Sequence, residues 1–338
     1  MRRSTYLGLA AFLLLLGVYG AYWFIVAGRI ADGFGQWAQS LRAQNLDLEW
    51  RAIGVGGFPL SFRVELNDAR LRDLAAAPVG EVRTPLLLGS ARPWNFRVWH
   101  LTAPAGLSAT AGPADRPQAT LKIETVAGSV AVGVDGGAAV WLGLGAPSLD
   151  AGVRLAAREA DLWLNLPQHP PQAHGEPTIG VALGVRELTL PAVPAPLRNP
   201  LDEIAFGVTL LGPIPAAPPR AAASAWRDAG GTLELDQFAL RWGTLAMTGS
   251  GTLALDRELQ PIGSFSSAIE GYDELTRALV AAGHLRPNEA RLAQVALAML
   301  ARTGPDGRPQ IATSFRLQDG QMYLGPVKLG KAPRIAWP

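Results

Sequence analysis

The sequence predicts a mainly β protein of the α+β class, in which an N-terminal transmembrane helix precedes a large antiparallel sheet. The chain opens with a long apolar run, and from Asp47 onward apolar residues recur at every second position, the period of a strand with one apolar face. The 38 glycines and 27 prolines of the 338 residues supply turns for many short strands. We expect the sheet to be curved or folded into a sandwich, with a C-terminal helical hairpin.

The apolar run covers Tyr6–Gly28 and contains no charged residue. At about 1.5 Å per residue, a helix of this length spans the roughly 30 Å hydrocarbon core of a membrane. Three aromatic residues gather near its C-terminal end, where such rings favour the membrane interface: Tyr19, Tyr22 and Trp23. Arg2 and Arg3 precede the run, and this positive charge favours a cytoplasmic N-terminus with the rest of the chain across the membrane.

A cleavable signal peptide is the alternative explanation of this run. The apolar region of such peptides is usually about 7–15 residues long and ends at a small-x-small cleavage site. Here the run is longer, and the nearest candidate site, Ile25-Val26-Ala27, has a bulky residue where a small one is preferred. An uncleaved anchor is therefore favoured, and we assign residues 1–28 to a cytoplasmic tip and transmembrane anchor.

Residues 29–46 are predicted to form a juxtamembrane helix. Apolar residues recur there at spacings of three and four, as on one helical face: Ile30, Phe34, Trp37 and Leu41. Gly33 and Gly35 weaken the helical pattern. The helix either packs on the following sheet as a stalk or lies on the membrane surface.

Residues 47–338 are assigned to a β-rich domain. Its first hairpin turns at Gly54–Gly57 and continues into a strictly alternating segment, Phe58–Leu66. The dipeptide Asn67-Asp68, which follows this segment, predicts a turn. Further alternating segments are Trp94–His100, Leu121–Ala127, Val130–Val134, Val140–Leu144, Leu162–Leu166, Ile179–Leu190 and Ile204–Leu210. The proline-rich zone 167–219 predicts edge strands, long loops and a domain seam.

The C-terminal third predicts two strands, two helices and a closing hairpin. Alternation from Phe238 to Leu255 passes through Gly249 and Gly251, where a bulge or a bend is expected. The predicted helices are Tyr272–Ala282 and Asn288–Arg302, the second capped by Asn288. The hairpin pairs Ile311–Leu317 with Gln321–Leu324 and turns at Asp319-Gly320.

Composition argues against several classes of function. Thirty basic and 28 acidic residues nearly cancel, and the absence of a dense Lys/Arg run argues against a nucleic-acid partner. The absence of cysteine excludes disulfides, thiolate metal sites and a Cys nucleophile. No Gly-x-Ser-x-Gly or Walker A motif occurs, and the four histidines lack metal-binding spacing. We therefore expect no enzyme and no catalytic, cofactor-binding or metal-binding residues.

The alternating strands instead predict an amphipathic sheet whose apolar face is the candidate functional surface. Its candidate residues are Phe58, Phe62, Val64, Leu240, Trp242 and Leu253. Phe58 is also expected to be buried where the turn enters the sheet. An open apolar face would bind acyl chains or another apolar partner, whereas a face covered by a second sheet or by helices would form a closed core.

Two stretches carry a family resemblance. The first, Gly54–Leu71, reads GVGGFPLSFRVELNDARL, and the second joins Gly249–Gly283 to the closing segment Asp319–Pro333, DGQMYLGPVKLGKAP. Together they resemble an uncharacterised family of Gram-negative envelope proteins, domain of unknown function family 2125. The motifs consist of glycine, proline and apolar residues, so the resemblance carries no catalytic positions over to this chain.

The second stretch is also similar to a segment of AsmA-like proteins, in which a Gly-x-Leu-x-Leu-Asp strand precedes a helical pair. That resemblance implies a bacterial inner-membrane anchor, a periplasmic β-structure and a role in lipid handling or envelope biogenesis. The partners it implies are the membrane, phospholipid or acyl chains, and other envelope proteins. The alternative is a non-catalytic structural or protein-interaction module with a closed core.

Overall fold

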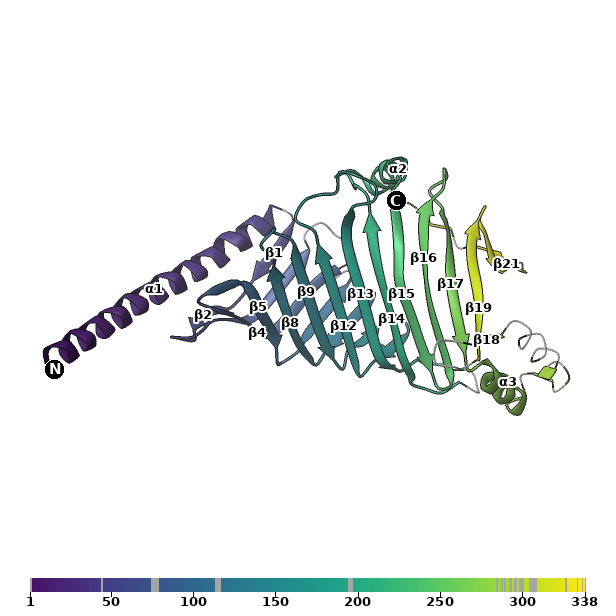
Figure 1. The fold of residues 1–338 in the computed structure, drawn as a ribbon, viewed down its shortest axis with the longest axis horizontal. Helices are drawn as coiled ribbons and strands as arrows, with labels where there is room; N and C mark the ends of the chain where they lie inside the picture. Colours follow the sequence, from purple (N-terminus) through teal and green to yellow (C-terminus); the bar gives the residue numbers. More distant parts are fainter. Residues whose placement is uncertain are drawn as a thin grey trace. The chain divides into compact units, whose positions relative to one another are not determined.

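The computed structural model describes residues 2–43, 45–73, 79–112, 117–193, 197–283, 285–286, 288, 290–291, 294, 297, 301–303, 309–325, 327–332, 334–335 and 337. Its strands form one large antiparallel open sheet, and an apolar helix opens the chain, so the predicted fold class is confirmed (Figure 1). The described helices are α1 (Arg2–Arg42), α2 (Pro219–Asp228) and α3 (Tyr272–Ala281). The chain divides into two compact units, residues 1–132 with 142–154 and residues 133–141 with 155–338.

The strands of the first unit begin after α1. They are β1 (Leu46–Glu49), β2 (Ala52–Gly56), β3 (Phe62–Asp73), β4 (Val79–Arg92), β5 (Asn95–Ala103), β6 (Leu107–Ala111), β7 (Ala119–Ile123), β8 (Thr125–Val132) and β10 (Ser148–Asp150). β3 pairs with β1 and β2 along one edge and with β4 along the other. β4 then pairs with β5 and β6, β5 with β8, β6 with β7, and β7 with β10. β3 is therefore the strand against which the first unit is organised.

The remaining strands belong to the second unit, apart from β9 (Ala138–Gly145) and the first residue of β11, where the division of the chain cuts through a strand. They are β11 (Arg154–Ala156), β12 (Glu159–Leu166), β13 (Pro177–Leu188), β14 (Leu201–Leu211), β15 (Thr232–Trp242), β16 (Leu245–Leu255), β17 (Pro261–Glu270), β18 (Ala301–Thr303), β19 (Pro309–Gln318), β20 (Gln321–Leu324) and β21 (Val327–Lys331). Successive pairings run from β12 to β17, continue to β19, and end with β20 and β21. The proline-rich zone 167–219 lies inside this unit.

Helix α1 is continuous from Arg2 to Arg42, so the anchor and the juxtamembrane segment predicted on either side of residue 28 belong to one helix. No proline interrupts this range, and the glycines at 33 and 35 are tolerated within it. Its Phe12–Arg42 part, with a mean hydropathy of 1.7 in its most apolar window, is long and apolar enough to cross a membrane. A signal sequence would meet the same criterion.

The three predictions for the C-terminal third have different outcomes. The predicted closing hairpin is confirmed, because β19 and β20 turn at Asp319-Gly320, where both residues adopt positive φ. The first predicted helix corresponds to α3. Of the second predicted helix, the described residues Asn288, Ala290, Arg291, Gln294 and Leu297 are helical, but the predicted end near Arg302 is wrong, because Ala301–Thr303 forms β18 and pairs with β19.

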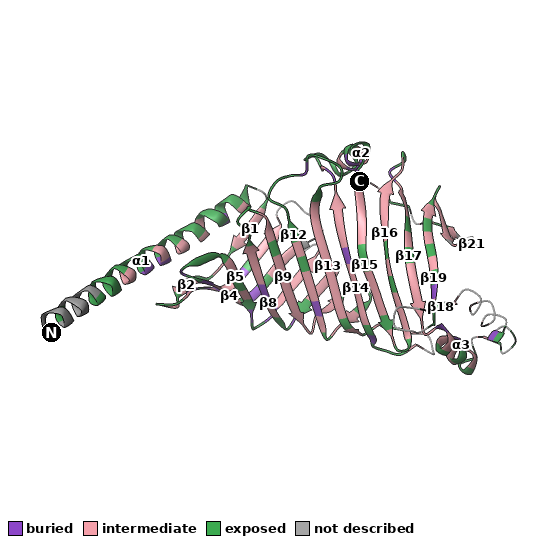
Figure 2. Ribbon diagram, in the orientation of Figure 1, coloured by how far each residue is buried: buried purple, intermediate pink, exposed green. Residues whose placement is uncertain are grey.

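Deep burial is confined to a small part of the described chain. Most strand residues are half-buried, as expected of a single sheet layer (Figure 2). Among the described residues, the large side chains that are exposed by less than 2% are those of Phe62 and Val64. Both belong to β3, and Phe62 packs in one cluster with Trp23 and Ala27 of α1. The core of the first unit therefore lies where α1 crosses β3.

Candidate apolar groove between α1 and the sheet

An aromatic contact fixes α1 to β3. The rings of Trp23 and Phe62 stack with centroids 5.0 Å apart and planes inclined by 10°. Trp23 is 3% exposed, and its indole Nε1–H donates to the carbonyl oxygen of Ser61 over 3.2 Å. Phe62 also contacts the ring of Phe96 from β5, with centroids 5.3 Å apart. We call the residues Trp23, Phe62 and Phe96 the aromatic seam.

A groove of about 620 Å³ lies beyond the aromatic seam, between α1 and the sheet of the first unit. One face of α1 forms its helical wall, because Ile30, Phe34 and Trp37 follow the three-to-four spacing of a helix. The sheet contributes mostly apolar residues from five strands: Leu48, Val64, Leu66, Ala69, Leu71, Val82, Leu87, Gly89, Trp99, Leu101 and Val130, with Leu107 from a sixth.

Both halves of β3 line the groove, but the positions that face it change from even to odd numbers along the strand. Val64 and Leu66 face it from even positions, whereas Ala69 and Leu71 face it from odd positions. Asp68 lies between them with φ of 50°, and it has no partner in the register with β4. Aspartate tolerates this left-handed conformation better than most residues. The predicted turn at Asn67-Asp68 is thus a local irregularity within a continuous strand: Asp68 and the opposite Pro85 are both unpaired, the register with β4 is unchanged, and both halves of β3 keep apolar residues on the groove side.

The chemistry of the groove suits an aliphatic ligand. Small-molecule pockets typically occupy about 300–1,000 Å³, so the groove has sufficient size. Its polar side chains are Arg70 and Thr84, and the Thr84 hydroxyl donates to the carbonyl oxygen of Gly106 over 2.8 Å. No carboxylate or imidazole belongs to the described lining, which therefore offers no general acid or base. Among the described residues, no group of three His, Cys, Asp or Glu could hold a metal ion.

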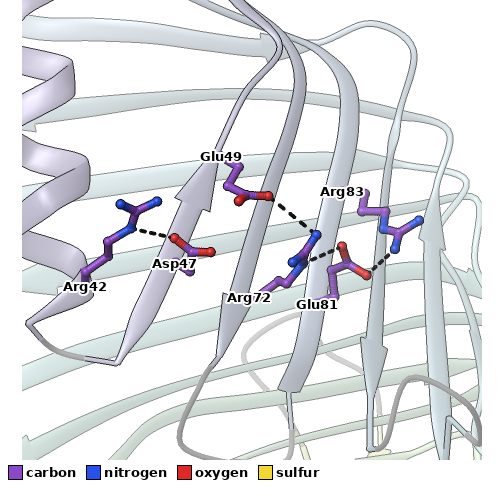
Figure 3. Close-up of polar contacts among 6 residues, drawn as sticks. All are labelled: Arg42, Asp47, Glu49, Arg72, Glu81 and Arg83. Carbon is purple, nitrogen blue, oxygen red and sulfur yellow. Dashed lines mark hydrogen bonds and ion pairs between the residues drawn. The ribbon is translucent and has the colours of Figure 1, made fainter.

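A polar network occupies the opposite face of the same strands (Figure 3). Arg42 at the end of α1 donates through Nε to Asp47 of β1 over 2.7 Å. Arg72 of β3 bridges Glu49 and Glu81 at 3.5 and 3.4 Å.

Glu81, on β4, accepts a second hydrogen bond, from Arg83 of the same strand. This hydrogen bond is the main cause that holds the pKa of the Glu81 carboxyl below its ordinary value, with the charge of Arg83 and the contact to Arg72 acting in the same direction. Glu49, Arg72, Glu81 and Arg83 thus join β1, β3 and β4, and the separate Arg42–Asp47 pair attaches the end of α1 to β1.

Residues 23–333 match the family described as an uncharacterized protein conserved in bacteria (DUF2125). The chain belongs to this family. The match confirms the resemblance inferred from the glycine- and proline-containing motifs, and it covers α1 from Trp23 together with the whole sheet of the first unit. No curated protein and no solved structure matches the chain. The similarity to AsmA-like proteins accordingly stays a prediction for this family member.

Of the predicted surface residues in the first unit, Val64 lines the groove, whereas Phe62 is buried in the aromatic seam against Trp23. The prediction that Phe58 is buried in the sheet is wrong, because its side chain is 50% exposed. Pairing between β2 and β3 ends at Gly56 and Arg63, so Phe58 lies in the connecting turn and not in a strand. Its ring packs on the outside of α1, stacked 5.8 Å from Phe24.

The other three predicted residues lie in the second unit. Leu240 pairs with Met247 and Leu253 with Leu233, which places both on the apolar face of β15 and β16. Trp242 follows on that face, half-buried, and its indole Nε1–H donates to the carbonyl oxygen of Arg198. The expected bulge is present as a register shift of β15 opposite Gly249 and Gly251. The six predicted residues are therefore divided between the two units, three in each.

Sequence reasoning missed the groove itself. It recognised the face of α1 that carries Ile30, Phe34 and Trp37, but it assigned that face no role in binding. It also left out Leu66 of β3 and Trp99 and Leu101 of β5, which line the groove. The available signal was the combination of a helical apolar face with the adjacent apolar strand face, because two such surfaces tend to pack on each other.

Proposed function

We propose that this chain is a single-pass protein of the bacterial inner membrane whose periplasmic β-structure binds a phospholipid acyl chain in the groove. The observation that carries the proposal is the nearly uninterrupted apolar lining of a 620 Å³ groove. One wall of that groove is the helix that also carries the candidate membrane span. Arg2 and Arg3 support the orientation, because positive charge beside a span favours the cytoplasmic side.

The expected energetics suit reversible binding of lipid. Burial of a dozen methylenes would gain about 10 kcal/mol, at roughly 0.8 kcal/mol each. Loss of translational and rotational freedom on association costs on the order of 4–15 kcal/mol, so most of the gain is offset. Such a balance fits a protein that receives and releases lipid, and it requires no chemical step. We therefore propose a non-catalytic role in lipid handling or envelope biogenesis, with phospholipid and other envelope proteins as partners.

A substitution that fills the groove tests this proposal. Gly33 of α1 lines the groove, and a Cβ added there would meet nothing within 4 Å, so Gly33→Trp can direct its ring into the groove. Gly35 offers a matched control on the same helix, since it also has no atom within 4 Å of an added Cβ and lies against a different, polar depression. Both changes replace glycine in a helix, so neither should weaken α1.

The measurement is native mass spectrometry of the full chain released from mild detergent, with retained phospholipid counted for each variant. Wild type and Gly35→Trp should retain phospholipid, and Gly33→Trp should lose it. Equal retention by both variants would reject the groove as the site. A lipid-free wild type would favour the alternative, a structural or protein-interaction module. A third variant, Trp242→Glu, puts a charge on the apolar face of the second unit. Loss of lipid in this variant alone would place binding on that face.

A further inference from the structure

Two turns of the first unit reach the apolar part of α1 (Figure 1). The turn between β2 and β3 contacts it at Pro59, whose carbonyl oxygen accepts a hydrogen bond from the Tyr19 hydroxyl. The turn between β4 and β5 contacts it at Pro93, whose carbonyl oxygen accepts from the Tyr22 hydroxyl over 3.3 Å. Both contacts lie within the uncharged run of the helix, before Arg29.

Large apolar side chains on these turns are exposed beside the helix. Phe58, Leu60 and Trp94 are exposed by 50%, 67% and 63%. Phe24 of α1, which stacks on Phe58, is itself 66% exposed. Single exposed apolar residues are ordinary, but a group that adjoins a candidate membrane span points to a membrane surface.

The length of α1 fixes how deep these turns can lie. If the hydrocarbon core ended at Arg29, Tyr19 would lie about 15 Å inside it, at 1.5 Å per residue. The backbone of both turns would then be in hydrocarbon, where each unpaired polar group costs several kcal/mol. The stretch from Ser4 to Trp23 already measures about 30 Å, which is the full thickness of the hydrocarbon core. The membrane boundary therefore fits at Tyr19–Trp23.

We propose that the β2–β3 and β4–β5 turns enter the lipid headgroup interface beside α1 through Phe58, Leu60 and Trp94. Aromatic rings favour this layer, whose interfacial region is roughly 5–7 Å thick on each side. Arg92, exposed at the end of β4, lies 5.9 Å from the ring centroid of Trp94 and can meet lipid phosphates there. This inference rests on the proposed membrane span of α1.

The consequence is a fixed distance between the groove and the membrane boundary. Its first helical residue, Ile30, follows Trp23 by about 10 Å along the helix. With the boundary at Tyr19–Trp23, the groove begins just outside the headgroup layer and is held there by α1 and by both turns. An acyl chain leaving the bilayer would then travel a short distance to reach it.

Site-directed spin labelling of the full chain tests the depth of the turns. The chain contains no cysteine, so each single-cysteine variant carries one label. Labels at Leu60→Cys and Trp94→Cys report the turns, Leu14→Cys reports the span, and Gln36→Cys reports the exposed helix about 20 Å beyond Trp23. The protein is reconstituted in vesicles of phosphatidylethanolamine and phosphatidylglycerol, and collisions with oxygen and with a water-soluble nickel chelate are compared.

We expect the labels at positions 60 and 94 to be less accessible to nickel and more accessible to oxygen than the label at position 36, with values between those of positions 14 and 36, as the headgroup interface requires. If positions 60 and 94 behave like position 36 and position 14 remains in lipid, the turns do not enter the interface although the span is correct. If position 14 is also accessible to nickel, the membrane span fails, and this inference fails with it.

Discussion

Replacement of Phe62 by alanine tests whether the aromatic seam is the core of the first unit. Phe62 is fully buried, stacks on Trp23 with centroids 5.0 Å apart, and contacts Phe96. Phe58, four residues earlier, contacts the same Trp23 edge-on at 5.5 Å, but half of its side chain is exposed. The pair therefore allows one substitution, Phe→Ala, to be compared at an enclosed and an open position.

The structure predicts different losses of unfolding free energy for the two variants. Phe62→Ala removes an enclosed ring and leaves a cavity, which costs about 3–5 kcal/mol. Phe58→Ala removes a half-exposed ring, so it should lose about half of the roughly 1.5–3 kcal/mol that full burial of such a side chain contributes. At about 2–4 °C per kcal/mol, Phe62→Ala should lower the Tm of the first unit by roughly 6–20 °C.

Thermal unfolding of the full chain in mild detergent, followed by far-UV circular dichroism, measures both values. Phe58→Ala serves as the control, because it shortens an aromatic side chain against the same helix. Equal Tm values for the two variants would show that Phe62 does not sit in an enclosed core. A larger loss for Phe58→Ala would contradict the packing of α1 on β3.

Two further predictions concern other parts of the structure. Gly271→Ala should destabilise the second unit more than Gly320→Ala in thermal unfolding. Both glycines have positive φ, a conformation that costs other residues about 1–2 kcal/mol. A Cβ at Gly271 would in addition collide with the Thr244 carbonyl oxygen, whereas a Cβ at Gly320 would meet no atom within 4 Å. Equal losses would contradict the close approach at Gly271. Because the folded pKa of Glu81 is lowered from 4.5, its stabilisation is present above about pH 4.5 and is lost as pH falls through the lower folded value. Glu81→Gln should therefore show a smaller loss of stability on acidification than wild type, and identical pH profiles would contradict this role for its ion pairs.

Local patterns predicted much of the fold. The uncharged run and its helical continuation became α1, and period-two alternation located most strands, because both signals depend on neighbouring residues only. The β19–β20 hairpin was predictable for the same reason, since Asp-Gly favours the positive φ that the turn requires. Alternation failed at Phe58, where an apolar residue in phase with the strand belongs to the turn that precedes it.

The groove was not predictable because it depends on long-range placement. Alternation shows that Val64, Leu66 and Leu101 face one side of a strand, but it contains no information on what covers that side. The covering element is α1, from a part of the chain that precedes the sheet, and its distance from the sheet depends on the bulk of Trp23 and Phe62 where they stack. The groove therefore depends on where α1 packs on the sheet, which neither the strand pattern nor the helix pattern contains.

The two attachments of α1 differ in strength, and the difference bears on how the groove could admit a lipid. At one end Trp23 is buried in the aromatic seam, so separation there exposes a large ring and breaks its hydrogen bond to Ser61. At the other end the Arg42 side chain is 59% exposed, and exposed ion pairs contribute only about 0–1 kcal/mol. Ala38 is buried near that end but has a small apolar area. Separation of α1 from the sheet therefore costs less free energy at Arg42 than at Trp23, so the groove can widen at its far end while the aromatic seam stays closed.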